Sequence, residues 1–121
     1  MMVRHKNGGV SALEVEINQF IRERDWDQYH TPKNLAMALS AETAEIVELF
    51  QWLTPEESSE LGSEKRAALE EEIGDVMIYL VTLAQKFSID PIEAAQKKLH
   101  INARKYPADR VRGRSNKYNE Y

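Results

Sequence analysis

Apolar residues recur at helical spacing along most of the chain, and short polar connections divide them into four segments. These segments predict helices at about residues 12–24, 32–53, 64–87 and 91–105. No stretch alternates apolar and polar residues with the period of a β-strand, and no Asn-Gly or Asp-Gly turn joins two such stretches. The pattern therefore predicts an all-α fold with a four-helix, bundle-like arrangement.

Residues that favour helix starts stand at the expected places. Ser11 is followed three residues later by Glu14, which is the spacing of a capping box. Thr31 and Asp90 each precede a proline, which suits the first helical position because its missing N–H is not needed there. Thr54 also precedes a proline, and this predicts one extra helical turn within the loop at 54–63.

The third predicted helix contains a segment, Val76 to Ala84, that is apolar on every side. Such a helix must be covered all round, which a chain of 121 residues can hardly do alone. We therefore expect a homo-oligomer with this helix at a subunit interface. The alternative is a central helix that is covered by its own three neighbours.

Two acids interrupt the apolar face of the second predicted helix. At about 100° per residue, Glu42 lies in the middle of that face and Glu45 at its edge, whereas Glu48 is rotated toward the polar side. Burial of an unpaired carboxylate is costly, so the first two must be protonated or compensated. The apolar residues that share the face of Glu42 are Leu35, Leu39, Ile46 and Leu49.

A second acidic pair, Glu72 and Asp75, stands in the third helix, where Glu72 shares its face with Val76, Tyr79 and Leu83. A short loop makes the second and third helices antiparallel neighbours, so the two pairs can form a box of four carboxylates. Hard oxygen ligands of this kind suit Mg²⁺, or Mn²⁺, and protein-bound magnesium commonly contacts substrate phosphates. The alternative is a set of ion pairs across the helices with Arg22, Arg24 or Lys86.

Composition narrows the class of protein. The chain has no cysteine, which excludes disulfides and thiolate sites, and its three histidines lack the spacing of a zinc motif. No signal peptide is recognised, and no apolar run approaches the roughly 20 residues that span a bilayer. These features predict a cytoplasmic protein without a membrane partner.

Charge is unevenly distributed around a net value of −4. Residues 42–75 contain eleven acids and two bases, whereas residues 97–117 contain eight Lys or Arg residues and one acid. This suits a divalent metal beside a polyphosphate, although an acidic surface with a basic tail would look the same. The expected organisation is a flexible N-terminus (1–10), a helical domain (11–106) and a basic C-terminal tail (107–121).

The acidic pairs, in ETAE and EEIGD, stand in a wider pattern that resembles the MazG-like all-α nucleoside triphosphate pyrophosphohydrolases, and more narrowly their dCTP pyrophosphatase branch. The similarity covers nearly all of residues 20–118. It implies a helical bundle that assembles into dimers or dimers of dimers. It also implies Mg²⁺-dependent hydrolysis of a nucleoside triphosphate to the monophosphate and pyrophosphate. The segments that carry the resemblance are FIRERDWDQYHTPKNLAMAL, AEIVELFQW, RAALEEEIGDVMIYLV, INARKYP and SNKY.

The resemblance also implies roles for individual residues. The metal-binding and catalytic carboxylates would be Glu42, Glu45, Glu72 and Asp75, the same four that helix geometry selects. The base pocket would be formed by Trp26, His30, Trp52 and Tyr79. Residues near the phosphates or base would be Lys98, Asn102 and Lys105. Ile17 departs from the pattern, since vertebrate members have a histidine there, and this weakens the expectation of strict cytosine selectivity.

The sequence thus predicts a Mg²⁺-dependent pyrophosphohydrolase that converts dCTP, including modified forms, to dCMP and pyrophosphate and so sanitises the nucleotide pool. A dUTP-directed or broad dNTP pyrophosphatase is the alternative within the family. A helical interaction module without enzymatic activity is the alternative outside it. A nucleic-acid partner is disfavoured because the body is acidic and has no interleaved basic and aromatic face. The general base stays open, with Glu45 as one candidate.

Overall fold

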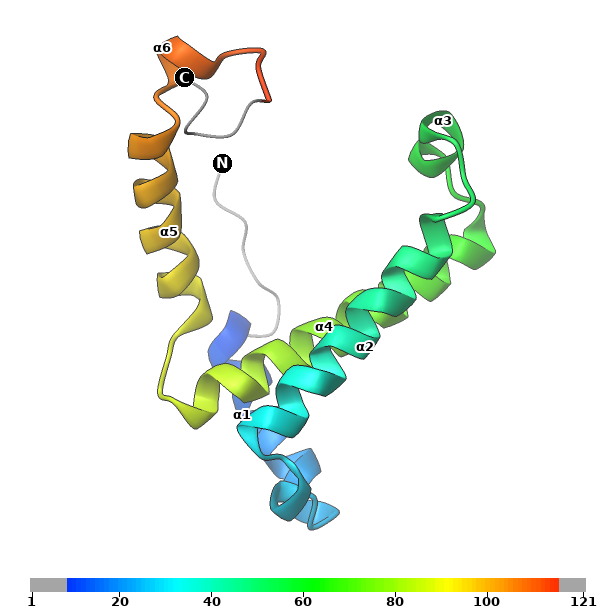
Figure 1. The fold of residues 1–121 in the computed structure, drawn as a ribbon. Coiled ribbons are helices and arrows are strands. Elements are labelled where there is room, and N and C mark those ends of the chain that lie inside the picture. Colours follow the sequence, from blue (N-terminus) through cyan, green and yellow to red (C-terminus); the bar gives the residue numbers. More distant parts are fainter. Residues whose placement is uncertain (1–8, 116–121) are drawn as a thin grey trace. The chain divides into compact units, whose positions relative to one another are not determined.

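The computed structural model describes residues 9–115, and its regular elements are all helical (Figure 1). Within this range there is no strand, which confirms the all-α prediction. The chain divides into two compact units, one up to Ser88 and one from Ile89. The elements in chain order are α1 (Gly9–Glu23), the 3-10 helix η1 (Asp27–Tyr29), α2 (Pro32–Phe50), α3 (Pro55–Ser59), α4 (Ser63–Lys86), α5 (Pro91–Lys105) and α6 (Ala108–Val111).

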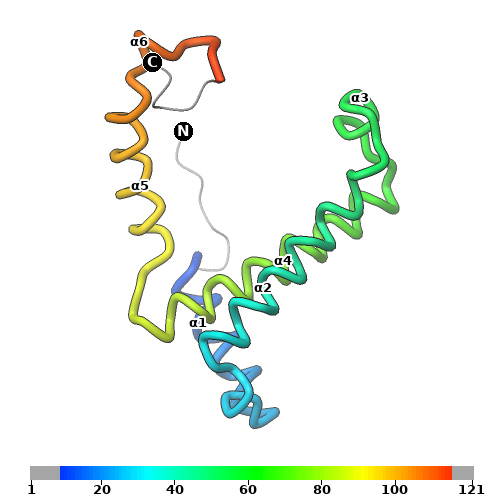
Figure 2. Tube along the Cα trace, in the orientation of Figure 1, coloured from blue at the N-terminus to red at the C-terminus, as the bar shows by residue number. Residues whose placement is uncertain are grey.

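The first unit is built around α2 and α4, which run antiparallel side by side, with α3 in the connection at one end (Figure 2). Helix α1 packs against α4. Ile17 and Ile21 of α1 form a buried cluster with Val81 of α4, and Val10 and Leu13 pack against it. This small core fixes α1 across the helix that carries the second acidic pair.

Most of the predicted helix starts are confirmed by their capping contacts. The Thr31 hydroxyl oxygen accepts a hydrogen bond from the N–H of Asn34 at 3.2 Å. Thr54 and Glu57 form a reciprocal capping box at the start of α3, which is the extra turn expected there. The carboxylate of Asp90 accepts hydrogen bonds from two N–H groups in the first turn of α5.

The prediction of Ser11 as an N-cap is wrong. Helix α1 already begins at Gly9, so Ser11 lies inside it on the exposed side. Val10 packs against the buried cluster together with Leu13. Burial of this extra apolar residue gives a physical reason for the helix to extend beyond the capping signal.

Helix α2 ends three residues before its predicted end at residue 53. Its last residue is Phe50, and a turn follows in which the N–H of Leu53 donates to the Phe50 carbonyl oxygen at 2.9 Å. The next residue, Thr54, takes an extended conformation to cap α3 (ψ 162°), as the following proline also favours. The extended conformation that Thr54 needs to cap α3 therefore prevents α2 from continuing through residue 54. The short elements η1 and α6 were not predicted.

Two faces of α4 carry different residues. The first holds Glu72, Asp75, Tyr79, Thr82 and Lys86, at the alternating spacing of three and four residues that keeps side chains on one side of a helix. The second is the apolar stripe of α4, whose residues also follow one another at spacings of three and four. Its large members are exposed: Ile73 (52%), Met77 (42%) and Leu80 (41%), followed by Phe87 (60%) at the C-cap position.

No helix among the described residues is both long enough and apolar enough to cross a membrane.

Candidate active site

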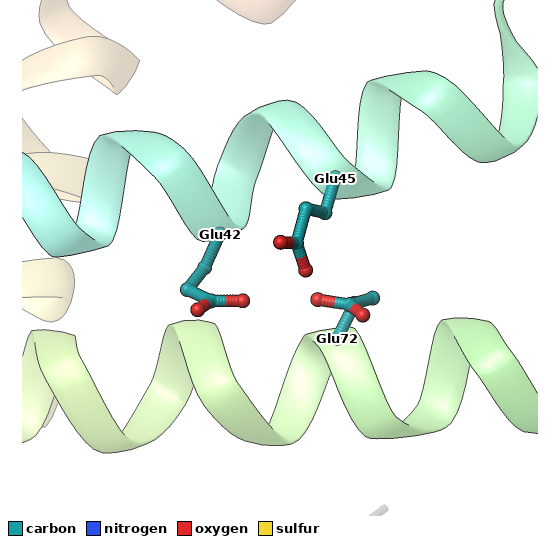
Figure 3. Close-up of side chains that lie close together, drawn as sticks. All are labelled: Glu42, Glu45 and Glu72. Carbon is teal, nitrogen blue, oxygen red and sulfur yellow. The ribbon is translucent and has the colours of Figure 1, made fainter.

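Three carboxylates meet in the space between α2 and α4. Glu42 and Glu45 lie on consecutive turns of α2, and Glu72 approaches from α4 (Figure 3). One carboxylate oxygen from each lies within 4.8 Å of the others. We call these three residues the acid cluster. They meet because the i, i+3 pair on α2 faces the antiparallel helix, as the apolar face of α2 requires.

The acid cluster has no cationic partner within residues 9–115, where none of the ion pairs includes its carboxylates. Arg24 lies 3.7 Å from Glu23, and Lys86 binds Asp27. The alternative of cross-helix ion pairs is therefore not observed. One oxygen of Glu42 and one of Glu72, in each case Oε2, are buried without a hydrogen-bond partner. Buried oxygens that lack a donor are what a bound cation would satisfy.

Glu42 and Glu72 each have a pKa above that of an isolated glutamate. The pKa of Glu72 is raised to about 7, chiefly because its protonated carboxyl can donate a hydrogen bond to Glu45, and further by burial and by the neighbouring charges. Burial is the main cause that raises the pKa of Glu42, and repulsion from Glu45 and Asp75 adds to it. An all-oxygen, electron-rich cluster of this kind could hold a divalent metal ion.

Metal-free protein is expected to lose stability as the pH rises from about 4.5 to about 7, because the pKa of Glu72 is raised over this interval. The folded state binds this proton more tightly than the unfolded chain does. The stabilisation is thus complete below pH 4.5 and is lost as the pH passes the folded-state pKa. Thermal unfolding in EDTA should show a steeper decline for wild type than for Glu72→Gln, whose amide does not titrate. Equal slopes would contradict the assignment.

Asp75 lies one helical turn from Glu72 but outside the acid cluster. It lines a cavity of about 380 Å³ between α1, the segment before α2, and α4. Three of the four predicted carboxylates thus lie together in the acid cluster. The fourth, Asp75, lies next to the cluster along α4 and lines the cavity. Its charge still reaches Glu42, whose pKa it helps to raise.

The cavity is mainly apolar and aromatic. Trp26, His30 and Tyr79, three of the four residues predicted for the base pocket, line it together. The Phe20 and Trp26 rings meet edge to face, with centroids 5.7 Å apart at 74°. The Nδ1 atom of His30 is buried and has no hydrogen-bond partner. The full lining is Leu13, Glu16, Ile17, Phe20, Ile21, Trp26, His30, Asp75, Ile78, Tyr79 and Thr82. A flat ring with polar edges fits such a site.

Sequence reasoning missed several residues of this wall. Phe20 was not selected although it follows Ile17 at helical spacing, because an apolar stripe on α1 predicts core packing equally well. Thr82 is 5% exposed, and its hydroxyl donates to the Ile78 carbonyl oxygen at 2.6 Å. Nothing in its sequence context distinguishes it from any other threonine in an apolar helix.

The remaining predicted residues are Trp52 in the first unit and three residues of the second unit. Trp52 follows the end of α2, is 86% exposed and is not part of the cavity wall. Lys98, Asn102 and Lys105 lie on α5 in the second unit, spaced to share one side of the helix. Their roles stay predictions.

Comparison with known proteins gives concordant results. The model of the MazG-like family matches residues 37–121. The chain is 48% identical to human dCTP pyrophosphatase 1 and 43% identical to the bovine protein, over 104 residues and 84% of its length in each case. It spans about three-fifths of the length of these relatives, 61% and 62%. The crystal structure of a pyrophosphatase from Archaeoglobus fulgidus DSM 4304 superposes with a TM-score of 0.78 at 41% identity, covering 88% of this chain and 99% of that one.

Proposed function

Because the chain belongs to the MazG-like family, we propose that it is a nucleoside triphosphate pyrophosphohydrolase. The observation that carries the proposal is the position of Asp75, which lies one turn from the acid cluster and in the wall of an aromatic cavity. A triphosphate must reach from a base-binding cavity to a metal-binding cluster, and these two sites adjoin along α4. A helical interaction module would have no need of buried, unpaired carboxylate oxygens.

The residues that would hold a divalent ion are Glu42, Glu45, Glu72 and Asp75, and Mg²⁺ is the proposed ion, with Mn²⁺ as a substitute. Such an ion, when bound, neutralises phosphate charge and lowers the pKa of a coordinated water. The donor set fits this ion, since it consists of carboxylates alone and includes two buried oxygens that lack a partner.

The chain's own side chains bind the nucleotide and accept a proton. The Trp26 ring provides a stacking surface for the base, and His30 offers its free Nδ1 to the base edge. In the reaction, a water oxygen forms a bond to the α-phosphorus while the bond from that phosphorus to the bridging oxygen breaks and pyrophosphate leaves. A glutamate of the acid cluster accepts the water proton. Glu45 is one candidate for this base.

The proposed substrate is dCTP, including modified forms, which would give the protein a role in sanitising the nucleotide pool. The support is the identity of 42–48% to proteins named dCTP pyrophosphatase 1. Ile17, which is 5% exposed in the cavity wall, offers no hydrogen bond to a base edge. A broad or dUTP-directed dNTP pyrophosphatase is therefore the second candidate, because this side chain does not select for cytosine. Lys98, Asn102 and Lys105 would bind phosphate or base from α5.

A panel of dNTPs and NTPs with Mg²⁺ tests the proposal. We expect one equivalent of pyrophosphate per nucleotide, no orthophosphate, the highest kcat/KM with dCTP and no turnover in EDTA. Orthophosphate release would place the cleavage at the wrong bond. Absence of hydrolysis across the whole panel would refute the enzymatic function.

We also propose that the protein is a homo-oligomer in which a second copy covers the apolar stripe of α4. Ile73, Met77 and Leu80 follow one another at the spacing of a helix–helix seam, yet each is more than 40% exposed. Sedimentation equilibrium of wild type beside Met77→Lys would report a loss of association if this stripe is the interface.

A further inference from the structure

The segment between α1 and α2 supplies Trp26 and His30 to the cavity of about 380 Å³ proposed to bind the base, here called the nucleotide cavity. Local contacts hold this segment to its own neighbours. The N–H of Trp26 donates to the Ile21 carbonyl oxygen at 3.1 Å. Asp25 has a positive φ of 52°, and the Gln28 amide donates to its carbonyl oxygen at 2.9 Å. These contacts shape the turn and tie it to α1. They do not join it to α4, which carries Asp75 and Tyr79.

One ion pair makes that connection. The ammonium group of Lys86, the last residue of α4, donates to Oδ1 of Asp27, the first residue of η1, at 2.9 Å. Within residues 9–115, no other hydrogen bond between side chains joins the 25–30 segment to α4. The two residues are 59 positions apart in the chain. Lys86 also lowers the pKa of Asp27, so the carboxylate is charged at neutral pH.

The ion pair lies beside the nucleotide cavity without entering it. Asp27 and Lys86 line a second cavity of about 370 Å³, whose wall shares Ile21 and Thr82 with the nucleotide cavity. Neither member of the pair lines the nucleotide cavity. The pair thus makes no contact inside the nucleotide cavity and is connected to it through the segment that it anchors.

We propose that the Asp27–Lys86 pair positions the Trp26–His30 segment as a wall of the nucleotide cavity, at a fixed distance from the residues of α4. Both are positioning residues, and they set how well the cavity is formed before a nucleotide binds. The pair is exposed, with 77% of the Asp27 side chain and 28% of the Lys86 side chain accessible. Exposed ion pairs contribute little to overall stability, so its loss should change the segment and leave the fold intact.

The first test needs no nucleotide and is independent of the proposed function. In a Trp52→Phe background, Trp26 is the only tryptophan, and acrylamide quenching of its fluorescence reports its exposure. Asp27→Asn and Lys86→Met should each raise the quenching constant, while Lys86→Arg should keep the wild-type value. Glu93→Gln is the matched control, since it removes a 3.1 Å ion pair with Lys97 elsewhere in the chain. Unchanged quenching in both test variants would overturn the proposal.

The second test rests on the proposed function and uses dCTP hydrolysis with Trp52 restored. Loss of the pair should raise KM on the order of threefold to fivefold, in line with the weak coupling of exposed pairs, while kcat stays within about twofold. The charge-swapped double variant Asp27→Lys/Lys86→Asp should recover part of the loss. A parallel fall in kcat and melting temperature would indicate a merely structural pair and would also overturn the proposal. An inactive wild type would refute the proposed function, whereas the quenching result would still decide the positioning role.

Discussion

Glu42→Gln is expected to lower kcat/KM on the order of 10²- to 10³-fold while the fold stays intact. The substitution keeps the size and polarity of the side chain and removes one negative charge from the acid cluster. Glu42 has a buried oxygen without a partner, and its pKa is raised chiefly by burial. Within residues 9–115, its charge takes part in no ion pair. Steady-state kinetics with saturating Mg²⁺ give the measurement, and near-normal activity would refute the metal-ligand assignment.

Glu48→Gln is the matched control, because Glu48 lies on the same helix, two turns beyond Glu42, and is exposed. It should retain wild-type activity. The melting temperature in EDTA at neutral pH adds a second readout, since removal of one of several mutually repelling acids should raise it for Glu42→Gln. A clear decrease would mean that Glu42 takes part in a stabilising ion pair.

Trp26→Ala should raise the KM for the nucleotide about ten- to hundredfold, because stacking of a base on an aromatic ring is worth roughly 1–3 kcal/mol. The effect on kcat should be small, because Trp26 is proposed to bind the base and to take no part in the reaction at the phosphorus atom. Trp26→Phe should recover much of the binding. A KM within twofold of wild type for Trp26→Ala would exclude this ring from the base site.

Tyr29→Ala controls for a general disturbance of the same segment, because Tyr29 is 62% exposed and does not line the cavity. Trp52→Ala answers a separate question. Trp52 is 86% exposed in one chain, so a large KM effect there would require something further to cover it, such as a second copy. No effect would remove Trp52 from the predicted base pocket.

The acid cluster could be predicted from the sequence, because helical periodicity and a short connection between two helices are enough to bring its residues together. Glu42 falls among apolar residues at about 100° per residue, and a short connection makes α2 and α4 antiparallel. The structure brings Glu42, Glu45 and Glu72 together as expected. Helix starts at Thr31, Thr54 and Asp90 were equally accessible, since each depends on contacts within one turn.

The structural features that could not be predicted from the sequence depend on packing between elements that are distant in the chain. Ser11 carried a capping signal, but burial of Val10 extended α1 past it. The place of Asp75 in a cavity wall shared with α1 depends on how α1 packs against α4, about which periodicity gives no information. Lys86 was considered only as a partner for the cluster acids, and its bond to Asp27 depends on the path of an irregular segment.

The first face of α4 fixes the distances between the metal-binding residues, the cavity wall and the ion pair with Asp27, because all of them include residues of one helix. From Glu72 to Lys86 it covers fourteen residue steps, or roughly 21 Å at about 1.5 Å per residue. One inserted residue within this stretch would rotate everything beyond it by about 100° and separate the metal ligands from the cavity wall and its anchor. The connection through α3 lies outside this stretch and joins α2 to α4 at the end away from α1 (Figure 1). A reporter peptide or linker inserted near residues 54–62 is therefore expected to leave the spacing along this face unchanged.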